Sequence, residues 1–367
     1  MGVPRTNGTA CFGSIEPASR LIGVAPYVPP ERESADLLRL DANEGPPCPQ
    51  RLLDALRGVS GESLRRYPQA GDLEARLARR WGIGAERVVV TAGAGDAIDR
   101  LCRVMLEPGR SILIHEPTFE MIPRYAHLAG AEVQSVPWVS GPFPLPGFLA
   151  AISPATRLVS LVSPNNPTGA AIGLRDIERV ADAAETLGSV VLVDLAYVEY
   201  ADSDPTRRLL DHPNVVVIRT FSKAPGLAGL RIGYTIAPLP PAPIAAWLRA
   251  AGSPYPVSSI SLMLAEAALE LPDDLRDAPI ARIRSERDRL STLLRRLGAE
   301  PLDSQANFVS VPVADAGAAR RTLADNGIAV RALPWGSAPA GFVRITLPGD
   351  EASFLRLVRA LEQAGGL

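Results

Sequence analysis

Residues 220–231 read TFSKAPGLAGLR, and they contain Lys223, the only lysine in the 367-residue chain. The other basic side chains, 37 of 38, are arginine, in a composition rich in Ala, Arg, Gly, Pro and Val that is typical of a GC-rich coding bias. Because arginine has taken the place of lysine wherever any cation suffices, we infer that Lys223 does chemistry that arginine cannot do. That chemistry is the loss of a proton and the formation of a Schiff base.

Apolar runs of strand length alternate with helical patterns around this stretch. We expect strands at 88–91, 111–115, 158–162, 190–193 and 215–218. Runs that are apolar throughout are typical of strands buried on both faces, so the sequence favours an α/β fold with a mostly parallel sheet covered by helices on both sides. In such sheets ligands bind at the carboxyl ends of the strands, and Lys223 lies just beyond one of these ends.

The pattern changes after about residue 270. We expect a long arginine-rich helix at 275–297, strands at 308–311, 328–331 and 342–346, a helix at 318–326 and a terminal helix from Asp350. The sequence therefore predicts a large cofactor-binding domain at 36–270 and a smaller α+β domain at 271–367. Residues 1–35, rich in Gly, Pro and Ser, are expected to form an N-terminal arm that packs with the smaller domain.

Composition excludes several classes of protein. The net charge of −2 lacks the basic excess of nucleic-acid binders, so no nucleic-acid partner is expected. Cys11, Cys48 and Cys102 have no C-x-x-C spacing and no histidine close by in sequence, so neither a disulfide framework nor a metal site is expected. With no signal-peptide pattern and no apolar run of roughly 18 to 20 residues, we expect a cytoplasmic protein without a membrane partner.

Three further motifs follow expected strands. They are Asp194 at the end of VLVD, SPNNPTG at 163–169 and GAGD at 93–96, where helix N–H groups can hold a phosphate. Each alone has an ordinary explanation: Asp194 can be a helix cap, SPNNPTG a proline-asparagine turn and GAGD a strand-to-helix turn. Together a Schiff-base lysine, a strand-end aspartate, an Asn-Pro turn and a phosphate cradle are the parts that a pyridoxal phosphate site requires.

On these residues the chain resembles the fold-type I, pyridoxal-phosphate-dependent aminotransferases of class I/II, and within them most of all the histidinol-phosphate aminotransferase group. The resemblance runs from about Leu21 to Ala364. It rests on SKA at 222–224, GLAGLRIGY at 226–234 and SPNNPTG at 163–169, with support from DANE at 41–44, RYP at 66–68, PYP at 254–256 and ANFV at 306–309. Leu195 and Pro225 depart from the family's usual Glu and aromatic residue, but neither departure removes a catalytic group.

The resemblance implies a pyridoxal 5′-phosphate cofactor. Lys223 would form the Schiff base with it and then move the Cα proton, and Asp194 would pair with the protonated pyridine nitrogen. The catalytic residues would thus be Lys223, Asp194 and Tyr197. The cofactor would also be bound by Tyr197 and Asn166 at the ring oxygen, Phe119 on the ring face, Ala94, Gly95, Ser222 and Arg231 at the phosphate, and Tyr67 from a neighbouring subunit.

By the same resemblance the substrate would be bound by Arg344, Arg331, Tyr27, Asn43 and Tyr255. Arg344 matches the arginine that clamps the substrate anion, a task suited to a planar bidentate donor. Two guanidinium groups that converge on one anion favour a dianionic phosphate. Histidinol phosphate is therefore the first compound to test, with amino acids as the other option.

We expect a homodimeric aminotransferase with a shared active site. It would transfer an amino group between glutamate or 2-oxoglutarate and a small anionic amino compound. One alternative stays open, a decarboxylase, oxidase or cyclase of a specialised pathway on the same scaffold. A ligand-sensing module joined to a DNA-binding domain is disfavoured, because we expect no extra domain of about 60 residues before Leu40 and the net charge is −2.

Overall fold

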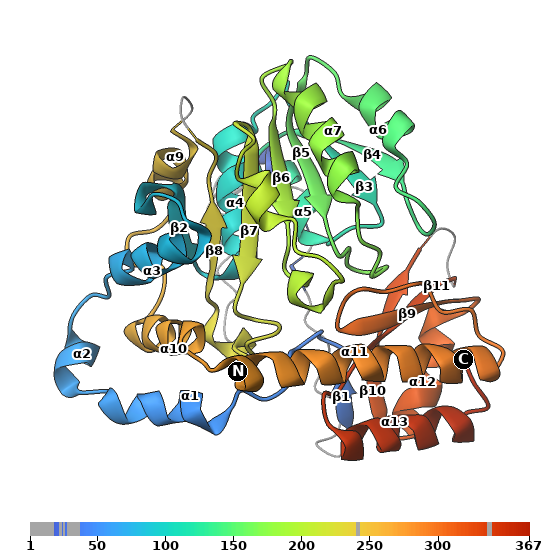
Figure 1. Cartoon of the computed structure of the whole chain (residues 1–367). Coiled ribbons are helices and arrows are strands. Elements are labelled where there is room, and N and C mark those ends of the chain that lie inside the picture. The colour runs from blue at the N-terminus through green and yellow to red at the C-terminus, as the bar shows by residue number, and fades with distance from the viewer. Residues whose placement is uncertain (1–17, 22–23, 25, 28–36, 240–242, 336–339) are drawn as a thin grey trace, which may run out of the picture.

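The computed structural model describes residues 18–21, 24, 26–27, 37–239, 243–335 and 340–367. Most of the predicted N-terminal arm, including Cys11, lies outside the described residues. Within them the chain forms two β-sheets, each packed against its own helices, and the long helix α11 (Asp273–Arg296) runs from beside one sheet to the other (Figure 1).

The larger sheet has seven strands and is mostly parallel, as predicted. Its spatial order is β2 (Val88–Thr91), β8 (Gly233–Ile236), β7 (Val215–Thr220), β6 (Val190–Asp194), β5 (Thr156–Val162), β3 (Ser111–Glu116) and β4 (Glu132–Pro137). Only β8 is antiparallel to its neighbours. The sequence did not reveal β4 or β8, because β4 is a largely solvent-facing edge strand and β8 is short and begins at a glycine.

Helices cover both faces of this sheet, and the alternation within β6 shows why its strands are apolar throughout. Val191 and Val193 pack into one core while Val190 and Leu192 pack into the other. The first core includes residues of α3 (Gly71–Trp81), α6 (Leu145–Ala151), α7 (Leu174–Glu185) and α10 (Ser259–Leu269). The second includes residues of α4 (Gly93–Met105), α5 (Met121–Leu128) and α9 (Ile244–Ala251) (Figure 1).

The smaller sheet has the order β1 (Leu38–Leu40), β10 (Ile328–Pro334), β11 (Gly341–Thr346) and β9 (Phe308–Val313). It shares a core with α11, α12 (Ala316–Asp325) and α13 (Glu351–Gln363). Asp315 and Asp350 cap α12 and α13 by accepting main-chain N–H bonds. All the C-terminal elements expected from the sequence are present. β1 belongs to this sheet although it falls within 36–270, and the division of the chain into domains stays a prediction.

The remaining elements are short. They are α1 (Gln50–Asp54), α2 (Gly61–Arg65), α8 (Thr206–Leu209) and the 3₁₀ helices η1 (Ser19–Leu21), η2 (Ala55–Gly58), η3 (Ala85–Arg87), η4 (Val198–Tyr200) and η5 (Ala228–Leu230). Among the described residues, no helix combines the length and the apolarity needed to cross a membrane.

The carboxyl ends of the central parallel strands face the smaller sheet. Lys223, three residues after β7, donates a hydrogen bond to the carbonyl of Asn43, three residues after β1. Arg344 of β11 donates to Asn166, four residues after β5. The fold thus brings the motifs that follow separate strands to one place between the two sheets.

Candidate active site

Two adjoining cavities lie where the sheets meet. The first, here called the strand-end cavity, has a volume of about 580 Å³ and lies at the carboxyl ends of the parallel strands. The second, the inter-sheet cavity, has a volume of about 410 Å³ and reaches β10 and β11 of the smaller sheet. Both are lined by Tyr27, Ala42, Phe119, Asn166, Tyr197 and Lys223.

The strand-end cavity collects all the predicted cofactor residues except Tyr67. Its lining includes Ala94, Gly95, Phe119, Asn166, Asp194, Tyr197, Ser222, Lys223 and Arg231. Tyr67 instead lies on the surface with 75% of its side chain exposed. Its ring stacks on Tyr255 at a centroid distance of 4.7 Å, and neither of these two tyrosines lines either cavity.

Lys223 projects into both cavities from the loop after β7. Its Nζ donates a hydrogen bond of 2.7 Å to the carbonyl of Asn43 and lies 5.2 Å from the centroid of the Tyr197 ring. Asn43 in turn donates from Nδ2 to the Tyr197 hydroxyl at 3.1 Å. A Cβ at Gly45 would stand 1.7 Å from the Lys223 carbonyl oxygen, so the chain can pass the lysine loop only with glycine at that position.

Asp194 is a buried carboxylate at the end of β6. Its side chain is 3% exposed, and Oδ1 accepts a hydrogen bond of 3.0 Å from the Ala196 N–H. Burial raises the pKa of this carboxyl group to about 6, and the Ala196 N–H and the charge of Lys223 offset only part of the rise. The ionised form therefore lacks a strong cationic partner among the described residues. A protonated ring nitrogen in the cavity would supply one.

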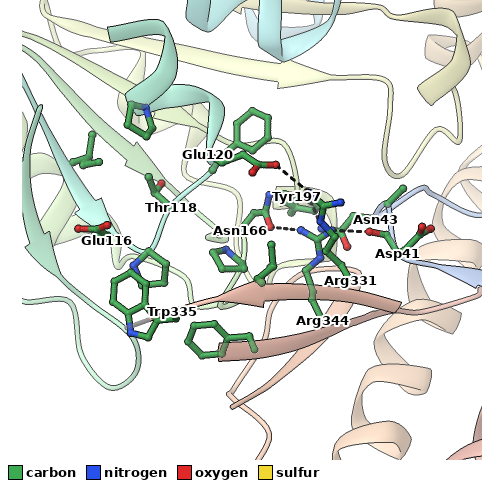
Figure 2. A pocket seen from close by; sticks show the side chains of 18 of the residues that line it. Asp41, Asn43, Glu116, Thr118, Glu120, Asn166, Tyr197, Arg331, Trp335 and Arg344 are labelled. Atoms are coloured by element: carbon green, nitrogen blue, oxygen red, sulfur yellow. Dashed lines mark hydrogen bonds and ion pairs between the residues drawn. The ribbon is translucent and has the colours of Figure 1, made fainter. Parts of the chain in front are cut away.

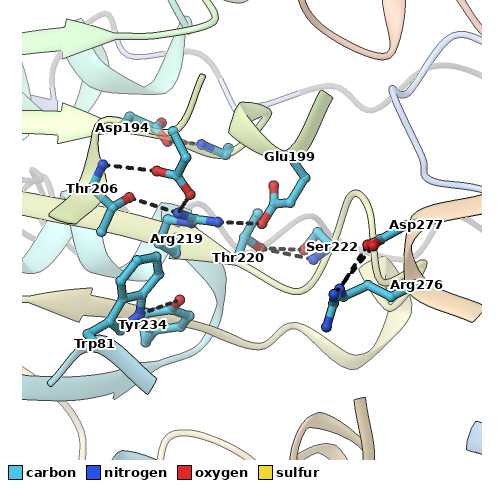
Figure 3. A network of polar contacts seen from close by, with 12 residues as sticks. Trp81, Asp194, Glu199, Thr206, Arg219, Thr220, Ser222, Tyr234, Arg276 and Asp277 are labelled. Carbon is cyan, nitrogen blue, oxygen red and sulfur yellow. Dashed lines mark hydrogen bonds and ion pairs between the residues drawn. The ribbon is translucent and has the colours of Figure 1, made fainter. Parts of the chain in front are cut away.

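A buried ion-pair network joins the segment after Asp194 to β7, the strand that precedes the Lys223 loop (Figure 3). Arg219 of β7 is 5% exposed and donates to Glu199 at 2.8 Å and to Asp204 at 2.7 Å. Since Glu199 follows Tyr197 by two residues and Thr220 leads to Lys223, the network fixes the two loops relative to each other. Breaking one partner of such a buried pair leaves a charge unpaired, which is costly.

The first turn of α4 and Arg231 together form an anion cradle. Ala94 and Gly95 lie in that turn, where N–H groups lack helical partners. A Cβ at Gly93 would lie 2.9 Å from Nη2 of Arg231, so the guanidinium lies directly beside the helix start. Arg231 itself has a left-handed φ of 49°. Helix N–H groups, a guanidinium and the nearby Ser222 hydroxyl suit a phosphate group.

Arg344 forms the polar end of the inter-sheet cavity (Figure 2). Its side chain is 7% exposed, and its two Nη atoms donate to Asn166 Oδ1 at 2.5 Å and to the Asp41 carbonyl at 2.9 Å. Nε is buried and has no hydrogen-bond partner within the described part of the chain. Burial lowers the pKa of this guanidinium, and the positive charge of Arg331 lowers it further, while the charge of Glu120 offsets part of the shift. A charged, buried group with neutral partners will attract a substrate anion.

Arg331, the second predicted substrate residue, is opposite Arg344 in the β10–β11 register. It pairs with Glu120, which the sequence analysis did not single out, at an Nη2–Oε1 distance of 3.6 Å. Other lining residues that were missed are Trp335 and Phe342. Glu120 directly follows Phe119, so its position beside the site was inferable, but its contact with β10 was not.

Comparison with known proteins decides the family. The sequence pattern of "Aminotransferase class I and II" matches residues 35–361. The chain belongs to this family. It is therefore an aminotransferase, and the cofactor of its class is pyridoxal 5′-phosphate.

Several aminotransferases are similar along most of their length. "Histidinol-phosphate aminotransferase 1" of Dechloromonas aromatica is 33% identical over 89% of this chain and 90% of the relative. The "Aromatic amino acid aminotransferase" of Mycobacteroides abscessus is 32% identical over 91% and 96%. The structure of a histidinol-phosphate aminotransferase from Sinorhizobium meliloti in complex with pyridoxal 5′-phosphate has a TM-score of 0.81 and 28% identity, covering 96% of this chain and 98% of that one.

Proposed function

We propose that this aminotransferase moves an amino group, in a ping-pong cycle, between glutamate or 2-oxoglutarate and a small anionic amino compound. Histidinol phosphate and amino acids are the candidates, in line with the relatives named after them. The observation that carries the proposal is Arg344, a buried guanidinium with neutral partners that faces the same cavity as Lys223. It is placed to bind a substrate anion beside the only lysine.

The strand-end cavity fits pyridoxal phosphate at both of its charged ends. Asp194 would keep the pyridine nitrogen protonated, while Asn166 and Tyr197 would bind the ring oxygen and Phe119 would cover the ring face. The phosphate would be bound by Ala94, Gly95, Ser222 and Arg231. When bound, the cofactor supplies an electron sink for the pair released as the Cα–H bond breaks.

The chain's own residues then position and move the proton. Arg344 binds the substrate anion and orients Cα toward Lys223. Lys223 Nζ, in its unprotonated form, would take the proton from Cα and give it up on the cofactor side rather than to Cα, because its return to Cα would only regenerate the amino compound. Asn43 and Tyr197 hold the lysine in reach through the 2.7 Å contact with Nζ and the 3.1 Å bond between them.

We also propose that the enzyme is a homodimer whose subunits complete each other's sites. The short helices after β1 carry exposed apolar side chains. The exposed residue Tyr67 follows these helices, and its ring stacks on the ring of Tyr255. The exposed residues of this surface are Leu53, Leu56, Leu64, Tyr67 and Tyr255. A surface of this kind favours a protein partner, and a second copy would bring Tyr67 to a neighbouring phosphate site. Cys48 and Cys102 are free thiols, which supports a cytoplasmic location.

The test is a half-reaction with purified holoenzyme. Glutamate, histidinol phosphate and single amino acids would each be added, and the cofactor absorbance would be followed together with the release of keto acid. The proposal expects the pyridoxamine spectrum to appear with one equivalent of keto acid. Release of CO₂ or hydrogen peroxide without keto acid would replace it by a decarboxylase or an oxidase on the same scaffold.

A further inference from the structure

Glu120 occupies a helix-capping position without capping the helix. It directly precedes α5, where an acidic side chain is favoured by the positive end of the helix and can accept an N–H bond of the first turn, although Asp, Asn, Ser and Thr are the usual capping residues. The Glu120 carboxylate makes no such bond and is directed instead across the inter-sheet cavity to Arg331 (Figure 2). The Glu120 carboxylate therefore contacts Arg331 on the opposite wall of the inter-sheet cavity and not the start of α5.

The other carboxylates of this cavity are engaged elsewhere. Asp41 pairs with Arg39 at 3.0 Å, and Glu116 accepts a hydrogen bond of 2.9 Å from the Ser135 hydroxyl. Among the described lining residues, Glu120 is therefore the carboxylate that offsets the charge of Arg331. Arg344 makes no ion pair with a carboxylate among the described residues, since its hydrogen bonds go to an amide oxygen and a carbonyl oxygen, and the charge of Glu120 acts on it only from a distance.

The inter-sheet cavity thus contains one guanidinium paired with a carboxylate, that of Arg331, and one without a carboxylate partner, that of Arg344. The wall beyond the pair is mostly apolar, with the rings of Trp335 and Phe342 at a centroid distance of 6.5 Å, Leu333, Pro117 and Pro123 in the lining, and Thr118 and Glu116 as its polar members. This arrangement suits a substrate with a single carboxylate on Arg344 and a side chain that carries no negative charge. A second anion, whether a carboxylate or a phosphate, has to displace Glu120 from Arg331.

We propose that Glu120 is a built-in substitute for the second substrate anion and sets which side-chain charge the pocket accepts. When the substrate side chain is apolar, Glu120 stays on Arg331 and no guanidinium charge is left unpaired. When a dicarboxylate such as 2-oxoglutarate binds, Glu120 moves away. The pair permits this exchange, since its atoms are 3.6 Å apart and the Glu120 side chain is 52% exposed. The inference rests on the proposed role of Arg344 as the carboxylate site.

The test measures binding of two acids that have no amino group and cannot react. Glutarate stands for the dicarboxylate and 3-phenylpropionate for the apolar monocarboxylate, each titrated calorimetrically into the holoenzyme. In Glu120→Gln we expect glutarate to bind about two to five times more tightly and 3-phenylpropionate to bind more weakly by a similar factor, the range for a half-exposed ion pair. The two affinities must move in opposite directions.

Glu116→Gln is the matched control, because it removes the same charge from the same cavity without touching Arg331. Affinities that change in the same direction in Glu120→Gln, or an equal selectivity change in the control, would overturn the proposal. Should Glu120→Gln fail to fold, Glu120→Ala carries the same test, with the same opposite changes of the two affinities expected. If the two affinities change in opposite directions but the enzyme forms no keto acid, the proposed function is wrong and this inference stands. If the enzyme forms keto acid but the two affinities do not change in opposite directions, this inference is wrong and the proposed function stands.

Discussion

The strand-end cavity and the inter-sheet cavity adjoin at Lys223 but are assembled differently. The strand-end cavity draws most of its lining from loops that follow consecutive strands of one sheet. The inter-sheet cavity combines the segment after β1, the β3–α5 loop and the strands β10 and β11. The first is therefore fixed by local motifs and one topology, while the second depends on how distant segments meet. On our proposal, the strand-end cavity carries the chemistry and the inter-sheet cavity sets the choice of substrate.

Replacement of Lys223 should have the largest effect on the chemistry that we assign to the strand-end cavity. We expect Lys223→Ala to lose turnover by more than roughly 10⁴-fold, since the Schiff base and the proton transfer both need this amine. Lys223→Arg is the matched control for charge and should be equally inactive, because arginine does not give up its proton. Borohydride reduction of the wild-type holoenzyme followed by peptide mapping should label Lys223. A label at another residue would disprove the assignment.

Asp194→Asn tests the electronic role of the same cavity. The amide keeps the size and the Ala196 N–H contact but cannot pair with a pyridinium charge, so we expect activity to fall by roughly 10²- to 10³-fold with the fold unchanged. In the holoenzyme the opposite charge of the ring should depress the pKa of Asp194. Steady-state turnover and the cofactor spectrum are the measurements. Wild-type turnover in the variant would show that Asp194 does not tune the ring.

Arg344→Ala tests whether the inter-sheet cavity binds the substrate anion. Each charge-assisted hydrogen bond contributes roughly 1.5 to 3 kcal/mol, so KM should rise by roughly 10- to 100-fold for every anionic substrate, with a smaller change in kcat. Arg331→Ala is the comparison variant, and it should affect only substrates that carry a second anion. Kinetics unchanged in Arg344→Ala would remove the anion-binding role.

The sequence predicted most of the strand-end cavity and only part of the inter-sheet cavity, for a physical reason. Lys223, Asp194 and Asn166 each follow an apolar strand, and parallel strands bring such ends together without further information. The ion pair of Glu120 with Arg331 joins residues 211 positions apart in sequence, one in the β3–α5 loop and the other on β10 of the smaller sheet. No periodicity or motif reports a contact of that kind. Strand β4 was missed likewise, because its exposed residues lack an apolar run.

On our proposal, Tyr67 of a second subunit completes the strand-end cavity, so the cavity of a single subunit lacks part of its phosphate site. If Tyr67 completes a neighbour's phosphate site, activity per subunit should fall on dilution in step with dimer content, as followed by analytical ultracentrifugation. Tyr67→Ala should weaken both cofactor affinity and the dimer, because the residue is 75% exposed and available to a partner. A monomer with full activity would rule out a shared site.

The smallest expected effect concerns the stability of the apoprotein. Burial raises the pKa of Asp194 from 3.8 to about 6, so the folded protein holds a proton that the unfolded chain has released. Stability is therefore lost as the pH rises from about 4 to about 6, and above that range the loss is complete, at about 1 to 3 kcal/mol. Asp194→Asn cannot ionise and should be more stable than the wild-type apoprotein above pH 6, with the difference vanishing near pH 4.

Thermal unfolding of the two apoproteins across this pH range measures the difference. Adding pyridoxal phosphate should reverse it, because the pyridinium charge supplies the partner that the buried carboxylate lacks and the amide cannot use it. A stability difference that is independent of pH would mean that Asp194 is not destabilised by burial. A difference that persists with the cofactor bound would mean that Asp194 does not meet the ring nitrogen. The second result would leave Lys223 as the only one of these two residues that acts on the cofactor.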